Sequence, residues 1–397
     1  MSSSANLNAG LRLWEIQKSQ GTGLCVGLDP HYDPNSALNE KLYLQFVDSD
    51  VELFLNRVVS YLDWPGFIGR PQAEFESSSR LTGFLAGVIG YYFQVIDAAW
   101  ESGIRVFKPQ AAFYERLGPF GLVVLELLLH HLRRLADRNQ SSFFAVLDVK
   151  RGDIDSTQEP YFWAYLANPD QEVIPGMGGR FGFDAMTVTT WMGSDVLTPG
   201  LPFFKAGKGA VIVTQTSNPS GTSFQDLLAF TNNGVVLNEN QRPFALSTDN
   251  LNQLSDLIGG SVPTVREAML WLTQKFSDQH ELDGGSGISP LFSVMGSTVR
   301  MSGSFRAIRP GGIALVPGFG AQGGKFGNIM PLLITEGELA GHLGILSSSR
   351  DHNFPWLPKA GGQGDPMQLK AEMARAIGVF REKEKAAYVE AGADYPF

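Results

Sequence analysis

Residues 143–153 of the chain, FFAVLDVKRGD, decide the fold class. The stretch begins with five apolar residues, as does a β-strand that is buried on both faces. The charged residues Asp148, Lys150 and Asp153 follow directly, so reactive side chains stand where a strand ends. Polar residues also follow other apolar runs along the chain, and this recurrence predicts a parallel sheet with one functional edge.

Eight apolar runs are candidate strands: Leu24–Leu28, Ile104–Phe107, Phe143–Leu147, Ala185–Val188, Ala210–Val213, Leu291–Met295, Gly312–Val316 and Leu343–Leu346. Helical patterns occupy several of the gaps, at Ser78–Glu101, Pro119–Arg138, Pro263–Phe276 and Met367–Ala387. Strands that alternate with helices in this number predict an α/β fold, a (β/α)8 TIM barrel. An open, doubly wound sheet is the alternative.

Two of the gaps, about residues 31–80 and 218–290, are too long for a plain strand–helix unit. We interpret both as long insertions into one TIM-barrel domain that spans residues 1–397. A hydrophobic content of 43% supplies enough apolar surface for one large core.

Composition argues against several classes of protein. The net charge of −9 and the lack of a basic block disfavour a nucleic-acid partner. The single cysteine, Cys25, lies in an apolar run typical of a core residue, and the six histidines form no metal-binding motif. The N-terminus lacks a signal-peptide pattern, and the most apolar run, Phe120–Leu132, is too short to span a bilayer. We therefore expect a cytoplasmic protein with no membrane partner and no metal.

Charged and polar residues stand at the ends of several predicted strands. Asp29 follows the first strand, Lys108 ends the second, Asp148 and Lys150 end the third, and Arg350 lies just past the eighth. In a barrel these ends open on one face, where active sites lie. Strand alternation puts Asp148 and Lys150 on the same side. Such a cluster is either a structural ion-pair network or a catalytic one, and its position at the strand ends favours catalysis.

A glycine-rich segment, residues 314–324 (ALVPGFGAQGG), follows the seventh predicted strand. As a dinucleotide-binding GxGxxG motif it is weak, because it lies late in the chain and no second βαβ half follows it. As a loop of backbone N–H groups it predicts a phosphate site, with Arg350 on the adjacent strand end as a bidentate partner. The polar loop 214–221, which contains Ser217, could contact a heterocycle or be an ordinary turn.

Five segments together resemble the orotidine 5'-monophosphate (OMP) decarboxylase family in its longer bacterial form. They are GLDP at 27–30, FKPQAAFYE at 107–115, LDVKRGDI at 147–154, TSNP at 216–219 and VPGFGAQGG at 316–324. The resemblance implies conversion of OMP to UMP and CO₂, the last step of UMP synthesis. It also implies that no metal or organic cofactor takes part, and that the chain forms a homodimer with its active sites at the interface.

The same resemblance implies a role for each matching residue. Lys108, Asp148, Lys150 and Asp153 would form the catalytic array, in which Asp148 repels the substrate carboxylate and Lys150 protonates C6. Asp153 and Thr157 would reach the partner's site, Asp29 and Lys108 would hold the ribose hydroxyls, and Ser217 would contact the pyrimidine. The expected phosphate site consists of Pro317, Gly318, Gly320, Gln322, Gly323 and Arg350. The chain departs from the family after Arg350, where Asp351-His352-Asn353 replaces apolar residues.

Three other functions remain open at this point. A Mg²⁺-dependent lyase similar to 3-hexulose-6-phosphate synthase would share DxKxxD but lack the lysine on the second strand. A catalytically silent nucleotide-binding or scaffolding protein could use the same barrel, with its insertions docking a partner. An NAD(P)-dependent dehydrogenase would rest on the GxGxxG pattern alone.

Overall fold

The computed structural model describes residues 7–33, 35–61, 75–229, 248–297, 304–319, 324–333, 339, 341–358 and 364–397. The side chains of residues 58–61 and 75–80 lie outside this description. Parts of both predicted insertions, and residues 320–323 of the glycine-rich loop, fall in the gaps.

Eight parallel strands close into a barrel in the order β1-β10-β9-β8-β7-β6-β3-β2. Their bounds are β1 Leu24–Leu28, β2 Val106–Pro109, β3 Phe144–Arg151, β6 Ala185–Val188, β7 Gly209–Gln215, β8 Leu291–Met295, β9 Ala314–Pro317 and β10 Gly344–Ser348. All eight predicted strands occur, so the TIM barrel is confirmed and the open sheet is wrong. Thr214, expected in a loop, lies inside β7, and the polar loop begins at Thr216.

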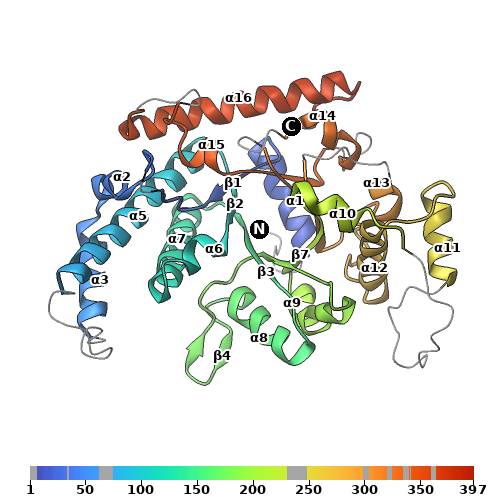
Figure 1. Cartoon of the computed structure of the whole chain (residues 1–397), viewed down its shortest axis with the longest axis horizontal. Coiled ribbons are helices and arrows are strands. Elements are labelled where there is room, and N and C mark those ends of the chain that lie inside the picture. The colour runs from blue at the N-terminus through green and yellow to red at the C-terminus, as the bar shows by residue number, and fades with distance from the viewer. Residues whose placement is uncertain are drawn as a thin grey trace.

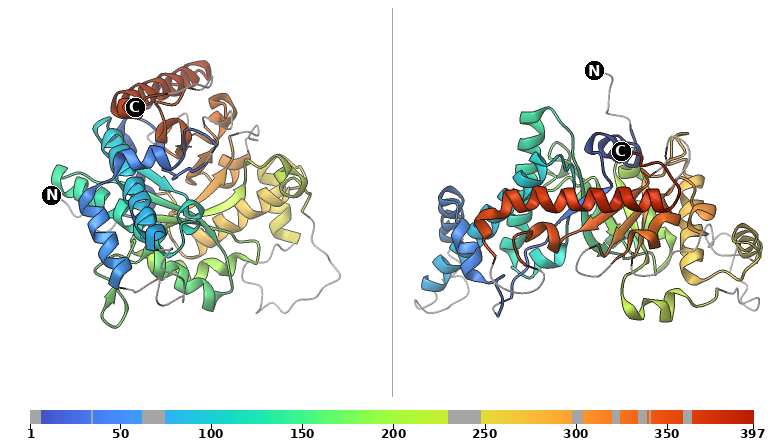
Figure 2. Two further views of the ribbon diagram at one scale, coloured as in Figure 1. Left: turned by 60° about the vertical axis from the view of Figure 1, so that its left-hand side comes forward. Right: turned by 90° about the horizontal axis from the view of Figure 1, so that it is seen from above.

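Helices lie around the outside of the strands (Figures 1 and 2). Their bounds are α1 Ala9–Gln20, α2 Glu40–Tyr43, α3 Ser49–Tyr61, α5 Phe75–Glu101, α6 Ala111–Glu115, α7 Pro119–Asn139, α8 Asp155–Leu166, α9 Leu201–Lys205, α10 Thr222–Gln225, α11 Thr248–Leu257, α12 Val265–Gln279, α13 Ser304–Ile308, α14 Phe326–Ile329, α15 Arg350–Asn353 and α16 Leu369–Glu390. Short 3₁₀ turns are η2 Leu44–Phe46, η4 Ser194–Gly200, η5 Pro219–Gly221, η7 Met330–Leu332 and η8 Pro366–Gln368.

Two hydrophobic clusters explain why the predicted strands are apolar along their whole length. In β1, Leu24, Val26 and Leu28 point outward into the layer between barrel and helices, whereas Cys25 points into the barrel interior. Every residue of β1 is buried, as strand alternation between two covered faces requires. Helix α1 packs Leu13 and Ile16 against the interior cluster, next to the N-terminal ends of the strands.

The described parts of the two insertions are mostly helical. Helices α2 and α3 pack against α5, and α11 packs against α12 and α13. Helix α12 starts with a capping box, in which Thr264 and Glu267 bond each other's backbone N–H groups. A small antiparallel hairpin, β4 Glu172–Ile174 with β5 Met177–Gly178, was not predicted, although the Pro-Gly pair between its strands is a turn signal.

Helix α5 contains an apolar segment, Leu81–Glu101, that is long and apolar enough to cross a membrane by length and composition. Of its most apolar window, 67% is buried inside the protein. The helix packs against α3, α7 and α16, and α16 extends along one side of the molecule, at the top of Figure 1. This burial is typical of a core helix of the barrel layer.

Candidate active site

The third strand is irregular where the charged residues stand. Leu147 pairs with Met186, and Arg151 pairs with Val188. An advance of four residues along β3 therefore corresponds to an advance of two residues along β6. The extra residues form a bulge at Asp148–Lys150, a feature common beside active sites. Lys150 has φ +48°, a left-handed conformation that costs a non-glycine residue about 1–2 kcal/mol. The surrounding contacts must offset this cost.

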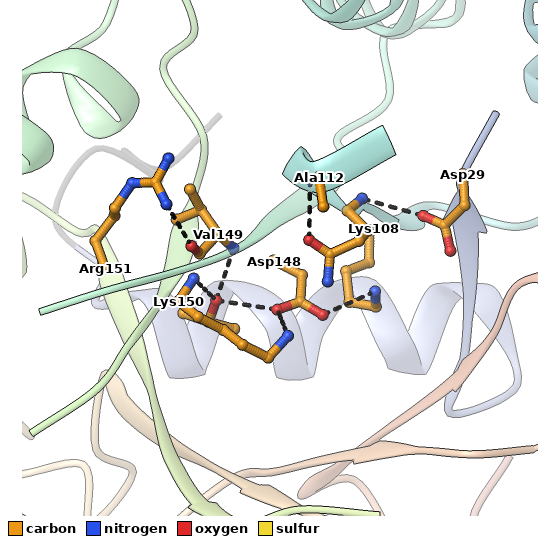
Figure 3. Close-up of polar contacts among 9 residues, drawn as sticks. Asp29, Lys108, Ala112, Asp148, Val149, Lys150 and Arg151 are labelled. Atoms are coloured by element: carbon orange, nitrogen blue, oxygen red, sulfur yellow. Dashed lines mark hydrogen bonds and ion pairs between the residues drawn. The ribbon is translucent and has the colours of Figure 1, made fainter. Parts of the chain in front are cut away.

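Asp148 lies between two lysines. Its Oδ1 accepts from Lys150 Nζ at 2.5 Å, and its Oδ2 faces Lys108 Nζ at 3.4 Å. Figure 3 shows the three side chains converging, with Lys108 from β2 and Lys150 from the bulge. Lys108 is buried, whereas the side chain of Lys150 is 47% exposed and therefore accessible to a ligand.

Two members of the array, Lys108 and Asp148, stay ionised at neutral pH. Burial alone would lower the pKa of Lys108, but the carboxylates of Asp148 and Asp29 outweigh it, and the pKa is raised above its ordinary value. Burial alone would raise the pKa of Asp148, but Lys108 and Lys150 outweigh it, and the pKa is lowered. The site therefore holds a carboxylate between ammonium groups, without water to screen them fully.

Asp29 lies at the end of β1 beside this array. Its Oδ1 accepts the backbone N–H of Gln110 at 3.0 Å, and its backbone carbonyl accepts the hydroxyl of Tyr92. In the amide orientation that satisfies both of its atoms, Asn353 donates to Gly27 O at 2.6 Å and accepts from Asp29 N at 3.3 Å. Asn353 belongs to the segment that departs from the family pattern, and here it holds Asp29 in place.

A glycine is required at position 27. A Cβ there would lie 1.9 Å from Ser349 Oγ and 3.0 Å from Ser349 Cα. The missing side chain lets the turn after β10 pack directly against β1. Arg350 starts α15 at this turn, is exposed, and lies close enough to His31 to lower its pKa, although burial is the larger cause.

The ends of β9 and β10 lie side by side, because Pro317 pairs with Ser347. Gly318 has φ +107°, and its carbonyl accepts the N–H of Gly324 at 2.9 Å, which closes the base of the glycine-rich loop. Pro317, Gly318 and Arg350 are thus on neighbouring strand ends, as predicted. Gly320, Gln322 and Gly323 lie outside the described residues.

Ser217 lies partly buried in the loop after β7. Gln225 fixes this loop, since it accepts from Thr216 N and donates to Thr216 Oγ1, both at 3.1 Å. The loop faces the end of β8, where a Cβ on Gly296 would lie 2.8 Å from Ser217 N. Ser217 therefore stands at the same face of the barrel as Asp148.

Asp153 and Thr157 are not part of the array within this chain. Among the described residues Asp153 has no ion pair, and its Oδ1 accepts the N–H of Ile154 at 2.8 Å. Thr157 is exposed on the first turns of α8. The structure thus brings together Asp29, Lys108, Asp148 and Lys150, and leaves the half-buried Asp153 and the exposed Thr157 outside this group.

Sequence reasoning missed three residues that support the array. Thr187 on β6 bonds the bulge, and Arg151 pairs with Glu115 at the end of α6. A threonine inside an apolar strand gives no distinct signal. The Arg151–Glu115 pair joins two of the motifs, but it becomes visible only once the ends of β2 and β3 are adjacent.

The structure also bears on two other kinds of reactive group, a nucleophilic cysteine and a metal-binding cluster. Burial raises the pKa of the Cys25 thiol to about 12, which removes it as a nucleophile at neutral pH. Within the described ranges, no group of three or more His, Cys, Asp or Glu side chains is arranged to hold a metal ion.

Comparison with known proteins agrees with this geometry. The model of the orotidine 5'-phosphate decarboxylase / HUMPS family matches residues 91–243, which include Lys108, Asp148 and Lys150. Orotidine 5'-phosphate decarboxylase of Myxococcus xanthus is 32% identical over 248 residues, 62% of this chain and 69% of that protein. The enzyme of Rhodopirellula baltica is 29% identical over 283 residues, 71% of this chain and 78% of that protein.

Solved structures share the fold. The orotidine 5'-monophosphate decarboxylase of Plasmodium berghei superposes with a TM-score of 0.56 at 16% identity, covering 94% of this chain and 99% of that one. The OMP decarboxylase of Leishmania donovani gives 0.53 at 17% identity, with the same coverage of 94% and 99%. With a relative at 32% identity along most of its length, and a lysine on β2 next to the bulged DxK segment of β3, this chain belongs to the orotidine 5'-phosphate decarboxylase family.

Proposed function

We propose that this chain converts OMP to UMP and CO₂. One observation carries the proposal above all others: the Asp148 carboxylate is flanked by the ammonium groups of Lys108 and Lys150 at 3.4 and 2.5 Å. Decarboxylation breaks the bond between C6 and its carboxylate and leaves an electron pair on C6. A proton must then reach that carbon, so the reaction takes up one proton and releases one CO₂.

Each residue of the array has a distinct task in this proposal. Asp148, kept anionic by its neighbours, would lie beside the substrate carboxylate and repel it. Lys150, whose side chain is half exposed, would stabilise the developing charge on C6 and donate the proton to it. The array is fixed before the substrate arrives, which is the form of electrostatic catalysis that costs little reorganisation.

The rest of the substrate would lie across the same face of the barrel. Asp29 and Lys108 would hold the ribose hydroxyls, and Ser217 would contact the pyrimidine. The phosphate would bind where β9 and β10 end, at Pro317, Gly318, Gly320, Gln322, Gly323 and Arg350. Binding energy from this remote anion can stabilise the strained geometry at the reacting carbon.

We also propose a cytoplasmic homodimer in which Asp153 and Thr157 complete the partner's site. The support is an exposed apolar group next to Asp153: Ile154 is 56% exposed, and Met192 and Trp191, past the end of the adjacent strand β6, are 58% and 42% exposed. Such side chains favour burial against another surface. A free, buried cysteine is compatible with a reducing compartment.

The activity is tested by following the orotate chromophore when purified protein meets OMP in the presence of EDTA. We expect loss of the chromophore together with release of CO₂. Tight binding of UMP without conversion of OMP would instead favour the silent nucleotide-binding alternative. Mg²⁺-dependent turnover of a phosphosugar would favour the 3-hexulose-6-phosphate synthase alternative.

The shared site is tested by mixing two inactive variants, Lys150→Ala and Asp153→Ala. Each mixed dimer would contain one site with both residues intact, so equal mixing should restore roughly a quarter of the wild-type activity. No recovery, with mixed dimers demonstrated by mass spectrometry, would show that Asp153 acts within its own subunit.

A further inference from the structure

The bulge in β3 leaves backbone groups that the strand ladder does not satisfy. Between Leu147 and Arg151, β3 and β6 lose their regular register, and the N–H groups of Val149 and Lys150 have no carbonyl partner on β6. Both N–H groups instead donate to one side-chain atom, Thr187 Oγ1, at 2.8 and 2.7 Å. A buried N–H without a partner is costly, so this bridge decides whether the bulge can form.

Thr187 uses its whole hydrogen-bonding capacity at this point. A hydroxyl has one proton to donate and two lone pairs that accept. The two lone pairs take the N–H groups of the bulge, and the proton goes to Asp148 Oδ1 at 3.1 Å. Thr187 is completely buried, so no bulk water competes for these bonds. Its proton is therefore committed to the carboxylate, which favours the ionised form.

The contacts link this hydroxyl to the position of Lys150. The left-handed backbone of Lys150 turns its side chain back over Asp148, where Nζ reaches the same Oδ1 that Thr187 contacts. One oxygen of Asp148 is thus fixed by Thr187 and Lys150. The other oxygen faces Lys108 (Figure 3). A change at Thr187 would release the backbone of Lys150 and the carboxylate of Asp148 together.

We propose that Thr187 is a positioning residue, whose hydroxyl holds the Asp148–Lys150 bulge in the geometry that presents the lysine ammonium to the substrate. The proposal rests on the proposed decarboxylase function. Thr187 acts through Asp148 and Lys150, so it affects the chemical step more than substrate binding.

Thr187→Val removes the hydroxyl at nearly constant volume, and Thr187→Ser retains it. We expect kcat to fall about 10–100-fold in Thr187→Val, with KM changed less than about threefold, and to stay within about fivefold of wild type in Thr187→Ser. Thr273→Val is the matched control, because Thr273 on α12 is also buried and, among the described residues, its hydroxyl bonds within its own helix, to Met269 O. That variant should keep the wild-type kcat.

A second readout does not depend on turnover. Without the hydroxyl bond the Asp148 carboxylate loses a donor, so its pKa should rise in Thr187→Val. The groups that face this carboxylate are Lys108 on β2, Lys150 on β3 and, beyond Lys108, Asp29 on β1. The shift is measured by carboxyl ¹³C NMR, with Asp148→Asn to assign the signal, and by the acid limb of the kcat profile moving to higher pH.

The outcomes separate the two proposals. If wild type does not decarboxylate OMP, the proposed function fails, and the NMR titration still tests the contact between Thr187 and Asp148. If wild type is active and Thr187→Val keeps both its kcat and the Asp148 titration, the positioning role is wrong. If Thr187→Val does not fold, Thr187→Cys replaces it, since a thiol is a weak donor and acceptor. Its kcat should then lie well below that of Thr187→Ser, and equality of the two would overturn the proposal.

Discussion

Lys108 and Lys208 are equally buried, each with 5% of its surface exposed, yet their environments shift their pKa values in opposite directions. Burial lowers the pKa of Lys208 to about 8, and it remains the dominant effect. At Lys108 the carboxylates of Asp148 and Asp29 outweigh burial, and the pKa is raised. The two lysines stand at opposite ends of the barrel. The opposite pKa shifts therefore separate the N-terminal end, where Lys208 supports the fold, from the C-terminal end, where we propose that Lys108 takes part in the reaction.

At the N-terminal end of the strands, buried polar groups bond both backbone atoms and neighbouring side chains. Lys208 Nζ donates to Gly182 O at 3.1 Å, Phe183 O at 2.9 Å and Asn168 Oδ1 at 2.7 Å. Glu384 of α16 accepts from Thr22 Oγ1 and from the N–H of Gly23, just before β1. All three protons of the Lys208 ammonium group are thus used, and Glu384 joins α16 to the barrel.

At the C-terminal end the charges pair with one another. Asp148 bonds two lysines, of which Lys150 is half exposed and adopts an unfavourable backbone conformation. Strain and incomplete burial of this kind lower stability and are retained where chemistry needs them. The comparison teaches that exposure and pairing, rather than burial alone, identify the functional charge.

The largest effect is expected for Lys150→Ala. Loss of the proton donor should lower kcat on the order of 10⁴-fold, the upper range for a single general acid. Because Lys150 is half exposed and Lys108 still pairs with Asp148, the midpoint of thermal unfolding should change little. Steady-state kinetics and thermal unfolding of the same preparation check both statements. Turnover close to wild type would contradict the assignment of Lys150.

Lys108→Met should act mainly on the reaction too. The substitution keeps the apolar stem and removes the ammonium group that faces Asp148 Oδ2. We expect kcat/KM to fall about 10²–10³-fold, as for loss of one preorganised charged partner. Measurement of UMP affinity beside kcat/KM separates the ribose contact from the electrostatic effect. An unchanged kcat/KM would place Lys108 among the structural charges.

Lys208→Met is the matched substitution at the other end of the barrel. It removes the donor from two backbone carbonyls and one amide oxygen, and it should lower the free energy of unfolding by about 2–3 kcal/mol. The folded fraction should keep the wild-type kcat/KM, because Lys208 is remote from the strand ends that carry the array. Urea denaturation and active-site titration test the pair of expectations. A loss of kcat without a loss of stability would contradict a purely structural role for Lys208.

His342, just before β10, should make stability depend on pH. Burial lowers its pKa to about 4, and its ring packs edge-on against Trp14 and Phe397, with centroids 6.1 and 4.9 Å away. His342 therefore takes up a proton near pH 6.5 in the unfolded chain, but only near pH 4 in the folded chain. Stability is therefore complete above pH 6.5 and falls by at most about 3 kcal/mol as the pH drops to about 4. His342→Phe should flatten this part of the stability profile, and an unchanged slope would assign the loss to other groups.

The sequence predicts more of this molecule at the level of strands than at the level of contacts. The run Leu24–Leu28 matches β1 residue for residue, because a strand covered on both faces must be apolar throughout. Regular alternation predicts that Asp148 and Lys150 meet, and they do, but through a bulge and a left-handed residue. The bulge depends on the register with β6, which no local pattern encodes.

The supporting residues show the same limit. Thr187 resembles any β-branched residue of a buried strand until β3 and β6 are paired. Asn353 stands in a segment that departs from the family pattern, and its contact with Asp29 joins residues more than 300 positions apart. Sequence motifs identify the residues that we propose to touch the substrate. The residues that hold those motifs in place come from distant parts of the chain and are identified by geometry.

The smallest effect is expected for Glu115→Gln. This substitution tests a charge pair that lies next to the array but is partly exposed to water. Glu115 pairs with Arg151 directly beside the bulge, but its side chain is 42% exposed and that of Arg151 is 28% exposed. Solvent screens such a pair, so the free energy of unfolding should change by less than about 1 kcal/mol. Arg151 also donates to Val149 O at 3.1 Å, so the bulge keeps a support, and kcat should fall less than about fivefold. Kinetics at low and high salt check this, since screening predicts that the difference from wild type shrinks as salt rises. A loss as large as that of Lys108→Met would mean that pairing next to the array matters even where water reaches it.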